Sequence, residues 1–225
     1  MTTVGFIGSG NIGGTVARLA VQGGYDVVLS NSRGPETLAG LVGELGPKAT
    51  AATAAEAAAA GDIVVVSVPF HVFPKLPAEE LAGKVVLDTN NYYPQRDGNV
   101  PELDEGLATS AEVEQRFLTG AKLVKVFNNI FFKHLGNLAR PQGDAERTSL
   151  TIAGDDAAAK LVATEFLDAI GYDAVDAGPL SESWRFEPGQ PAYGPPYGSF
   201  EDPAGTPASA EKVRAALAEA KKPAN

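Results

Sequence analysis

The stretch GFIGSGNIGG, residues 5–14, decides the fold. Three of its glycines, Gly8, Gly10 and Gly13, form a GxGxxG spacing that directly follows a short apolar run and directly precedes the amphipathic segment from Asn11 to Gln22. The first glycine permits a tight turn, the second lets the backbone approach a pyrophosphate, and the third lets a helix pack close to its strand. The spacing alone is weak in a chain with 25 glycines, but its place between a strand and a helix predicts a dinucleotide site.

Short apolar runs and helical stretches alternate along most of the chain, as expected of strand, crossover helix and parallel strand. The apolar run at residues 63–68 is typical of a strand that helices cover on both faces. The sequence therefore predicts an α/β fold with a Rossmann-like, doubly wound, mostly parallel sheet of about eight strands. The expected strands are residues 3–7, 25–30, 49–52, 63–68, 85–88, 123–127, 150–153 and 174–177, and the expected helices are residues 11–22, 35–45, 53–60, 155–170 and 210–221.

The composition changes after Trp184. Residues 186–207 contain six prolines and four glycines, interleaved with four aromatic side chains, and such a stretch cannot form a regular element. Its aromatic content favours order over disorder. We therefore expect a dinucleotide-binding Rossmann-like domain at residues 1–183 and a C-terminal extension at residues 184–225. The extension is expected to pack on the same domain as a lid, a dimer contact or a substrate platform, with its final helix on the surface.

Composition excludes several classes of function. The chain has 225 residues, of which 44% are hydrophobic and 20% charged, so one folded unit is expected. No run approaches the roughly 18 apolar residues that cross a bilayer, so no membrane partner is predicted. A net charge of -10 disfavours nucleic acid. The lack of cysteine excludes thiol chemistry and, with no apparent secretory leader, suits a cytoplasmic protein.

SNSRG, residues 30–34, follows the second expected strand and lacks the carboxylate that binds the ribose hydroxyls in NAD proteins of this fold. Asn31, Ser32 and Arg33 instead offer amide, hydroxyl and guanidinium donors, and Arg33 lies 20 positions after the last glycine of the motif. A charge-assisted hydrogen bond contributes about 1.5–3 kcal/mol, so Arg33 alone favours a 2′-phosphate about tenfold to a hundredfold. The predicted cofactor is NADP(H). The alternative is that Arg33 is a solvated loop arginine that binds no ligand.

The turns after the other central strands should line the nicotinamide half of the cofactor. Residues 68–70 offer a restrained apolar surface, while asparagines in the later turns can bind amide or ribose groups or, alternatively, cap helices. The predicted cofactor-binding residues are Gly8, Ser9, Gly10, Asn11, Ile12, Gly13, Asn31, Ser32, Arg33, Val68, Pro69, Phe70, Asn90, Asn128 and Asn129.

No side chain is assigned as catalytic. The two histidines, His71 and His134, have neither metal nor triad spacing and are expected on the surface or on a helix face. Asp155 and Asp156 open a helix, whose positive end suits carboxylates. Hydride transfer between bound redox carriers needs oriented rings and exclusion of water more than strong acids or bases, so this sequence suits an oxidoreductase without a metal site.

Four stretches, GFIGSGNIGGTVA (5–17), SNSRGPETL (30–38), VKVFNNI (124–130) and AGPLSES (177–183), resemble in order and spacing the NADPH-dependent reductases of the deazaflavin coenzyme F420. The Rossmann domain of that family is also similar to that of the STEAP metalloreductases. The resemblance implies a protein, often dimeric, that moves hydride between NADPH and the deazaflavin. It places Ser32 and Arg33 at the 2′-phosphate, residues 8–12 at the pyrophosphate, and Pro69 with Phe70 at the nicotinamide.

The resemblance ends after residue 183, where this chain continues as WRFEPGQPAYGPPYG (184–198). Its aromatic residues, Trp184, Phe186, Tyr193 and Tyr197, are interpreted either as a platform for a second substrate, with Arg185 meeting an anionic group, or as anchors of the tail. The favoured function is an NADPH-dependent oxidoreductase with F420 as its small-molecule redox partner, in a possible homodimer. The alternatives are a reductase of a flavin, quinone or carbonyl compound, and a non-catalytic NADP(H) sensor.

Overall fold

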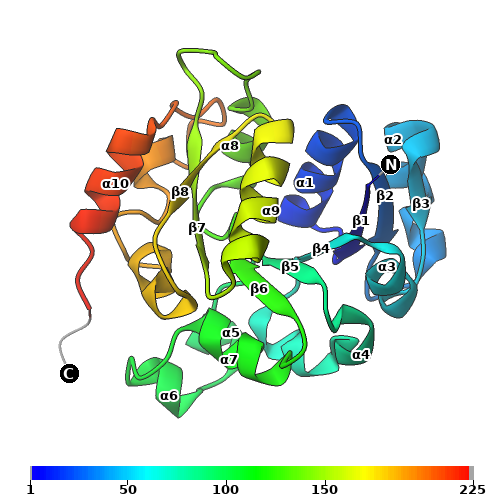
Figure 1. Cartoon of the computed structure of the whole chain (residues 1–225), viewed down its shortest axis with the longest axis horizontal. Helices are drawn as coiled ribbons and strands as arrows, with labels where there is room; N and C mark the ends of the chain where they lie inside the picture. The colour runs from blue at the N-terminus through cyan, green and yellow to red at the C-terminus, as the bar shows by residue number, and fades with distance from the viewer. Residues whose placement is uncertain (1, 223–225) are drawn as a thin grey trace.

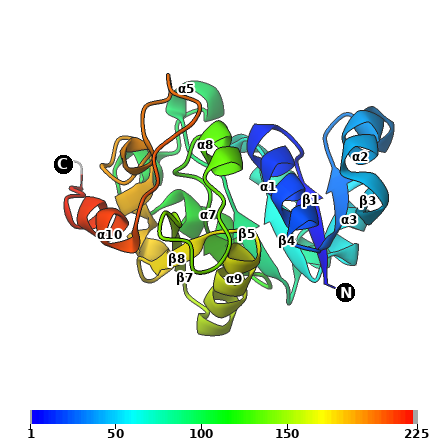
Figure 2. The same ribbon diagram turned by 90° about the horizontal axis from the view of Figure 1, so that it is seen from above.

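A single eight-stranded sheet forms the centre of the molecule, in a computed structural model that describes residues 2–222. The strands run in the order β3-β2-β1-β4-β5-β6-β7-β8, and every neighbouring pair is parallel except β6 and β7. Helices cover the sheet on both sides (Figures 1 and 2). The predicted Rossmann-like, mostly parallel α/β fold is therefore confirmed. The strands are β1 (Thr3–Ile7), β2 (Asp26–Ser30), β3 (Ala49–Ala51), β4 (Ile63–Val66), β5 (Val85–Asp88), β6 (Lys122–Lys125), β7 (Ser149–Gly154) and β8 (Asp173–Asp176).

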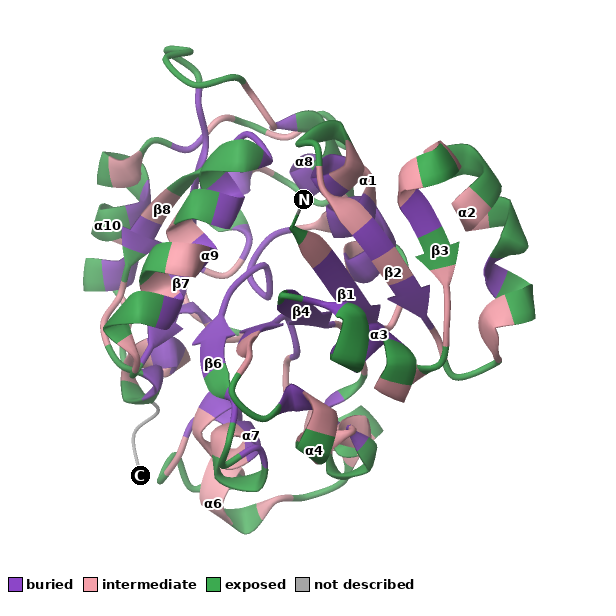
Figure 3. Cartoon of the chain, turned by 45° about the vertical axis from the view of Figure 1, so that its right-hand side comes forward, coloured by how far each residue is buried: buried purple, intermediate pink, exposed green. Residues whose placement is uncertain are grey.

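Two hydrophobic clusters hold the sheet between its helical layers. Along each central strand the buried side chains alternate between the clusters, as the two-residue period of a strand requires. In β4, for example, Val65 belongs to one cluster and Val64 and Val66 to the other. Figure 3 shows the central strands buried while the helices keep exposed outer faces. The apolar runs in the sequence therefore correspond to strands covered on both faces.

The strand order reverses between β1 and β4. From β1 the chain builds outward through β2 to β3, and it then returns to place β4 on the other side of β1. Such a reversal leaves a crevice beyond the carboxyl ends of the two strands, and ligands of open parallel sheets bind there. The glycine motif follows β1 at this point, and residues 67–69 follow β4.

The longer predicted helices are present, with capping side chains at several starts. Thr53 and Glu56 form a reciprocal capping box at α3, and Asp156 caps α9 through the amide of Ala159. The helices are α1 (Asn11–Gln22), α2 (Ala39–Leu45, after a 3-10 turn at Pro35–Leu38), α3 (Ala54–Ala60), α4 (Ala78–Leu81), α5 (Pro94–Asp97), α6 (Pro101–Asp104), α7 (Ser110–Phe117), α8 (Phe132–Asn137), α9 (Ala157–Ala169) and α10 (Ala210–Ala218).

Five short helices, α4 to α8, have no counterpart among the predicted elements. Pro94 and Pro101 begin α5 and α6, where the fixed φ of proline suits a first helical turn. Thr109 and Glu112 form a capping box at α7, so the T-x-x-E pattern in the sequence was a usable signal for that helix. The other short helices carry too few residues for a clear helical period.

The C-terminal extension packs into the same core as the sheet. Phe186 and Tyr197 are fully buried, and in α10 Val213 and Leu217 face β7 and β8. The amide of Ser149 also donates to the carbonyl of Ala208 at 2.8 Å. Helix α10 ends at Ala218, earlier than expected, and its apolar stripe lies in the core while its other face is exposed.

Between Thr2 and Lys222, no helix is both long and apolar enough to cross a membrane. The same part of the chain holds no group of three or more His, Cys, Asp or Glu side chains arranged to bind a metal ion.

Candidate functional site

A cavity of about 560 Å³ lies beyond the carboxyl ends of β1, β4, β5 and β6. Its walls come from the turns that follow these four strands and from the C-terminal extension. The volume is in the range of pockets that bind cofactors or drug-sized molecules. Eight of the predicted cofactor-binding residues line it: Gly10, Asn11, Ile12, Val68, Pro69, Asn90, Asn128 and Asn129.

The glycine motif forms a tight elbow beside this cavity. Gly8 has a φ of 98°, and a Cβ there would lie 2.1 Å from the carbonyl oxygen of Ser67. A Cβ on Gly13 would lie 2.1 Å from the carbonyl oxygen of Gly8, so the start of α1 can approach β1 only with glycine at that position. A Cβ on Gly10 would meet nothing within 4 Å. Gly8 and Gly13 therefore shape the elbow, while Gly10 leaves its open side free.

The first turn of α1 points unneutralised amides toward the open side of the elbow. Gly10 is the N-cap residue, no side chain caps the helix, and the first turn contains no acidic residue. The amides at a helix start attract anions because they combine free donors with the positive end of the helix dipole. The elbow thus fits the pyrophosphate of a dinucleotide in both shape and charge.

The predicted 2′-phosphate residues lie in the turn after β2. Asn31 is occupied within this turn: its Nδ2 donates to Thr37 Oγ1 at 2.9 Å, and its Oδ1 accepts from the amide of Arg33 at 2.9 Å. Ser32 and Arg33 are exposed. Within residues 2–222, the guanidinium of Arg33 makes no hydrogen bond or ion pair, so it is available to a ligand. Ser9, for its part, donates to the carbonyl of Ser30 at 2.9 Å and ties the elbow to β2.

Phe70 does not line the cavity, although the sequence suggested that it would. It is 1% exposed and packs behind the wall against Phe73 and Tyr92, with ring centroids 4.9 and 5.5 Å apart. The physical reason is the 3-10 turn Phe70–Lys75, which begins at this residue and turns its ring into the interior. Val68 and Pro69, directly before the turn, remain on the wall.

The three asparagines predicted for the nicotinamide half of the cofactor, Asn90, Asn128 and Asn129, connect loops, and none of them caps a helix. Asn90 accepts from the amide of Val68 at 3.0 Å and donates to Glu114 at 2.8 Å. Asn128 donates to the carbonyl of Phe186 at 3.0 Å, and Asn129 donates to the carbonyl of Ala192 at 2.9 Å.

The side-chain oxygens of Asn128 and Asn129 are buried and have no hydrogen-bond partner within the described chain. The residue before them, Phe127, is held at a φ of 64°, a conformation that costs about 1–3 kcal/mol for a non-glycine residue. The strained backbone turns the chain sharply after β6 and directs both asparagines to the cavity wall. Each asparagine therefore borders the cavity while its side-chain oxygen is buried among protein atoms.

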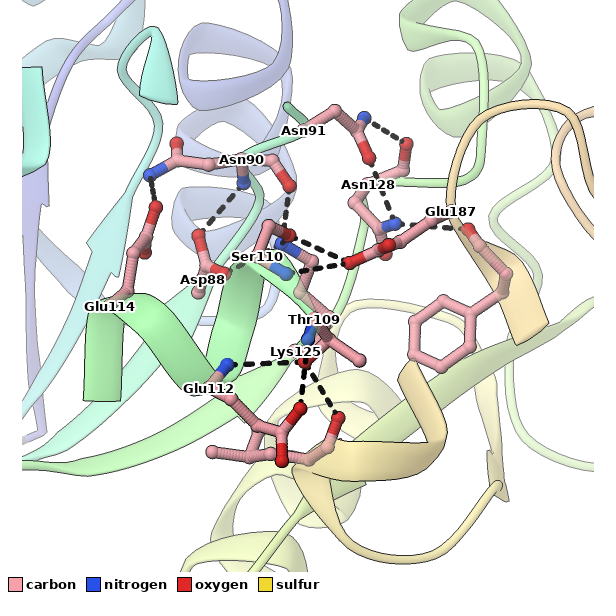
Figure 4. A network of polar contacts seen from close by, with 12 residues as sticks. Asp88, Asn90, Asn91, Thr109, Ser110, Glu112, Glu114, Lys125, Asn128 and Glu187 are labelled. Carbon is pink, nitrogen blue, oxygen red and sulfur yellow. Dashed lines mark hydrogen bonds and ion pairs between the residues drawn. The ribbon is translucent and has the colours of Figure 1, made fainter. Parts of the chain in front are cut away.

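A buried ionic network supports the floor of the site (Figure 4). The Lys125 ammonium lies 2.8 Å from the Asp88 carboxylate, and both side chains are 0% exposed. It also donates to the carbonyl of Asn90 and, at 3.2 Å, to the hydroxyl of Ser110. Ser110 in turn donates to Glu187 of the C-terminal extension at 2.8 Å. The network thus connects β5, β6, α7 and the extension beneath the cavity.

Burial and neighbouring charges shift the pKa values of two groups in this network, Glu114 and Lys125. Burial, and then the negative charge of Asp88, raise the pKa of Glu114 well above its usual range. Burial opposes the charge of Lys125, but Asp88, Glu114 and Glu187 outweigh that effect and raise the pKa of the lysine. Sequence reasoning missed these groups because a single strand does not reveal its neighbour in the sheet.

Aromatic side chains form a further part of the cavity wall. The sequence did give a signal for some of them, since aromatics directly follow both asparagine pairs, in NNYY and in NNIFF. The side chains involved, together with one arginine, are Tyr93, Arg96, Phe131, Phe132, Tyr193 and Phe200.

The tail aromatics contribute less to the site than the platform interpretation expected. Of the four, only Tyr193 lines this cavity, because Phe186 and Tyr197 are buried in the core and Trp184 lines a separate cavity. Arg185 donates to the carbonyl of Leu217 at 2.9 Å and so holds α10 in place.

Neither histidine belongs to the cavity. His71 pairs with Asp97 at 2.8 Å near the surface. His134 lies on α8, as a helix-face residue, and is buried beneath the extension, where its Nε2 contacts the carbonyl of Asp202 at 2.8 Å.

Two comparisons of the sequence agree with this architecture. Residues 3–92 match the family model described as NADP oxidoreductase, coenzyme F420-dependent. The chain is also 31% identical over 189 residues to metalloreductase STEAP3 of Rattus norvegicus, a match that covers 82% of this chain and 35% of that protein. The chain thus spans about a third of the length of this relative.

Solved structures share most of the fold. A hypothetical protein, SMa0349 from Sinorhizobium meliloti, superposes with a TM-score of 0.74 at 27% identity, covering 85% of this chain and 93% of the other. A candidate F420-dependent NADP-reductase from Arthrobacter sp. FB24 superposes with a TM-score of 0.68 at 27% identity, covering 81% of this chain and 87% of the other. From the match over residues 3–92 and these likenesses in sequence and fold, the chain is similar to the coenzyme F420-dependent NADP oxidoreductases and to the STEAP metalloreductases.

Proposed function

We propose that this protein transfers hydride between NADP(H) and a second carrier, most directly the deazaflavin coenzyme F420. The observation that carries the proposal is that residues of the glycine elbow and several aromatic side chains line the same cavity. A dinucleotide on the elbow would extend toward the aromatic wall, where a planar second carrier could stack. Bound NADPH would supply the hydride, and the protein would supply position and exclusion of water.

The residues that would hold the cofactor follow from the geometry. The amides at the start of α1 would bind the pyrophosphate, with Gly10 providing the close approach. Ser32 and Arg33 would bind the 2′-phosphate, since both side chains are exposed beside the elbow. Val68 and Pro69 would support the nicotinamide side. Asn128 and Asn129, which line the same cavity, would border this half of the cofactor.

The cavity supports an enzyme over a non-catalytic sensor. A sensor can fill the space beside the nicotinamide with its own side chains, whereas an enzyme needs room there for a second substrate. About 560 Å³ of space between the elbow and the aromatic wall favours the enzyme.

The direct test is to mix the protein with NADPH and oxidised F420 without oxygen and to follow the loss of the deazaflavin absorbance. Loss at a rate proportional to enzyme concentration is the expected result. If F420 is not reduced but a flavin, quinone or carbonyl compound oxidises NADPH, the acceptor is not F420, and the protein is still a reductase. No oxidation of NADPH by any of them would contradict the redox function.

Cofactor choice can be tested on its own through Arg33→Ala. The preference for NADPH over NADH, measured as a ratio of dissociation constants, should fall about tenfold to a hundredfold, as expected for the loss of a charge-assisted hydrogen bond. Arg214→Ala, an exposed arginine of α10, is the matched control and should leave the ratio unchanged. An unchanged ratio in Arg33→Ala would remove this residue from phosphate recognition.

A further inference from the structure

Two phenol groups meet at the cavity wall from distant parts of the chain. The hydroxyl oxygens of Tyr93 and Tyr193 are 2.6 Å apart, although the residues are 100 positions apart in the sequence. Tyr93 directly precedes α5, and Tyr193 belongs to the C-terminal extension. Both side chains are partly buried, and both line the same cavity as the glycine elbow.

One of the two hydroxyl hydrogens of this pair has no acceptor within the described protein. Two neutral phenols carry two hydroxyl hydrogens, and only one of them can lie between the two oxygens. Within residues 2–222 neither oxygen has another hydrogen-bond partner. The phenol that accepts the mutual bond must therefore turn its own hydrogen elsewhere, and the cavity is the space that both residues border.

We propose that the Tyr93–Tyr193 hydroxyl pair is the hydrogen-bond and proton donor to the second substrate. This inference rests on the proposed function and names a donor for the same site. The substrate class it implies is a planar redox ring with a carbonyl oxygen or ring nitrogen at its edge, because such an atom accepts a hydrogen bond before reduction and a proton during it.

The proton is needed for the reaction to balance. When a hydride adds to a carbon of the acceptor ring, a new C–H bond forms and an electron pair moves onto the heteroatom at the ring edge. That heteroatom takes the proton of the phenol, so its new bond to hydrogen forms as the phenol O–H bond breaks. The phenolate then regains a proton from solvent. NADPH loses the hydride and becomes NADP⁺, and the acceptor gains two electrons and two hydrogens in all.

A fixed cation stands beside the pair. The Arg96 guanidinium lies 4.9 Å from the centroid of the Tyr93 ring and would stabilise negative charge on the phenolate. Two hydrogen bonds of 2.8 Å to Asp97, and one of 2.7 Å to the carbonyl of Asn91, hold it there.

The phenol proton also stays bound before the hydride is transferred. Burial, followed by the hydrogen bond with Tyr93, raises the pKa of Tyr193 above its usual value, so the Tyr193 phenol is neutral at physiological pH. A pair that served only as a latch between the extension and the α5 loop would need the mutual bond alone. The second hydrogen at the cavity wall is what distinguishes a donor from a latch.

The test compares Tyr93→Phe, Tyr193→Phe and the double variant with Tyr92→Phe. Tyr92 is a matched control, because its hydroxyl bonds to Gly98 and Asp104 and does not line the cavity. Oxidised F420, and FMN as a second probe, are titrated into the NADP⁺-saturated protein. The double variant should bind the probe about 3- to 10-fold more weakly, the loss expected for one neutral hydrogen bond. Each single variant keeps one phenol and should fall between.

A single-turnover measurement at saturating acceptor separates binding from proton transfer. The double variant should reduce the acceptor about a hundredfold more slowly, the usual effect of removing a general acid. NADPH affinity and thermal unfolding should match those of the wild type, which excludes misfolding. Binding and rate within about twofold of wild type, or no binding of either probe to the wild type, would overturn the inference. If probe binding depends on the two hydroxyls but NADPH is never oxidised, the donor site stands and the redox function fails.

Discussion

Lys125 and Asp88 form an ion pair of 2.8 Å in which neither side chain is exposed to solvent. Removing one member of a buried pair leaves the other charge without compensation, which typically costs about 3–5 kcal/mol. Lys125→Met should therefore lower the free energy of unfolding by about this amount. Lys122→Met is the control on the same strand: its ammonium is 3.4 Å from Asp156 and 45% exposed, so the loss should be below about 1 kcal/mol. Urea unfolding of both variants checks the difference, and equal losses would contradict it.

Glu114 should make stability depend on pH. Its pKa is raised in the folded protein, so the protonated carboxyl stabilises the fold below the ordinary pKa of glutamate, about 4.3, and this contribution is lost as pH rises toward the folded value. Glu114→Gln resembles the protonated carboxyl and keeps an acceptor for Asn90. Its stability relative to wild type should therefore increase as pH rises from about 4.3. Urea unfolding at several pH values measures this, with the exposed Glu105→Gln as control; parallel pH profiles for wild type and Glu114→Gln would refute it.

Substitutions of two elbow glycines should affect folding and cofactor binding differently. A Cβ on Gly13 collides with the carbonyl of Gly8, whereas a Cβ on Gly10 meets no protein atom within 4 Å. Gly13→Ala should therefore lower both the melting temperature and NADPH affinity. Gly10→Ala should melt within a few degrees of wild type, since an alanine N-cap costs only about 1 kcal/mol, yet bind NADPH at least about tenfold more weakly. Gly40→Ala, with open space around it in α2, should change neither quantity. Full NADPH affinity in Gly10→Ala would place the pyrophosphate elsewhere.

We propose that residues 184–225 belong to the same folding unit as the sheet. Tyr197 and Phe186 are fully buried in the cluster that includes β1 and α9, and truncating such a side chain to alanine costs about 3–5 kcal/mol. Tyr197→Ala should therefore lower the free energy of unfolding of the whole protein in one cooperative transition. Phe200→Ala is the control, because that ring is 55% exposed and its loss should cost far less. Two separate transitions would show that the extension folds independently.

The homodimer also remains a prediction from the family resemblance, and light scattering of the purified protein would test it. A mass corresponding to one chain of 23.2 kDa would contradict it.

The sequence was most informative where local chemistry determines structure. The glycine spacing fixed the elbow after β1, and the apolar runs located the strands to within a few residues, because both signals lie within a few neighbouring positions. The strands ended earlier than expected at β4 and β6, where the chain leaves the sheet to form the turns that line the cavity. The side chains of Asn90 and Asn91 bond to backbone groups of these turns.

The rest of the site depends on contacts that no local pattern contains. Lys125 meets Asp88 only because β5 and β6 are neighbours in the sheet, and Tyr93 meets Tyr193 only because the extension folds back over the cavity. The direction of Phe70 followed from a 3-10 turn with too few residues to leave a periodic signal. Sequence analysis therefore located the glycine-elbow part of the cavity better than its aromatic part.

The aromatic side owes Tyr193 and Phe200 to a stretch that follows the last strand of the sheet, far along the chain from the elbow. Under the proposed function, substitutions at these two positions would therefore alter the preference for an acceptor and leave the preference for a nucleotide unchanged.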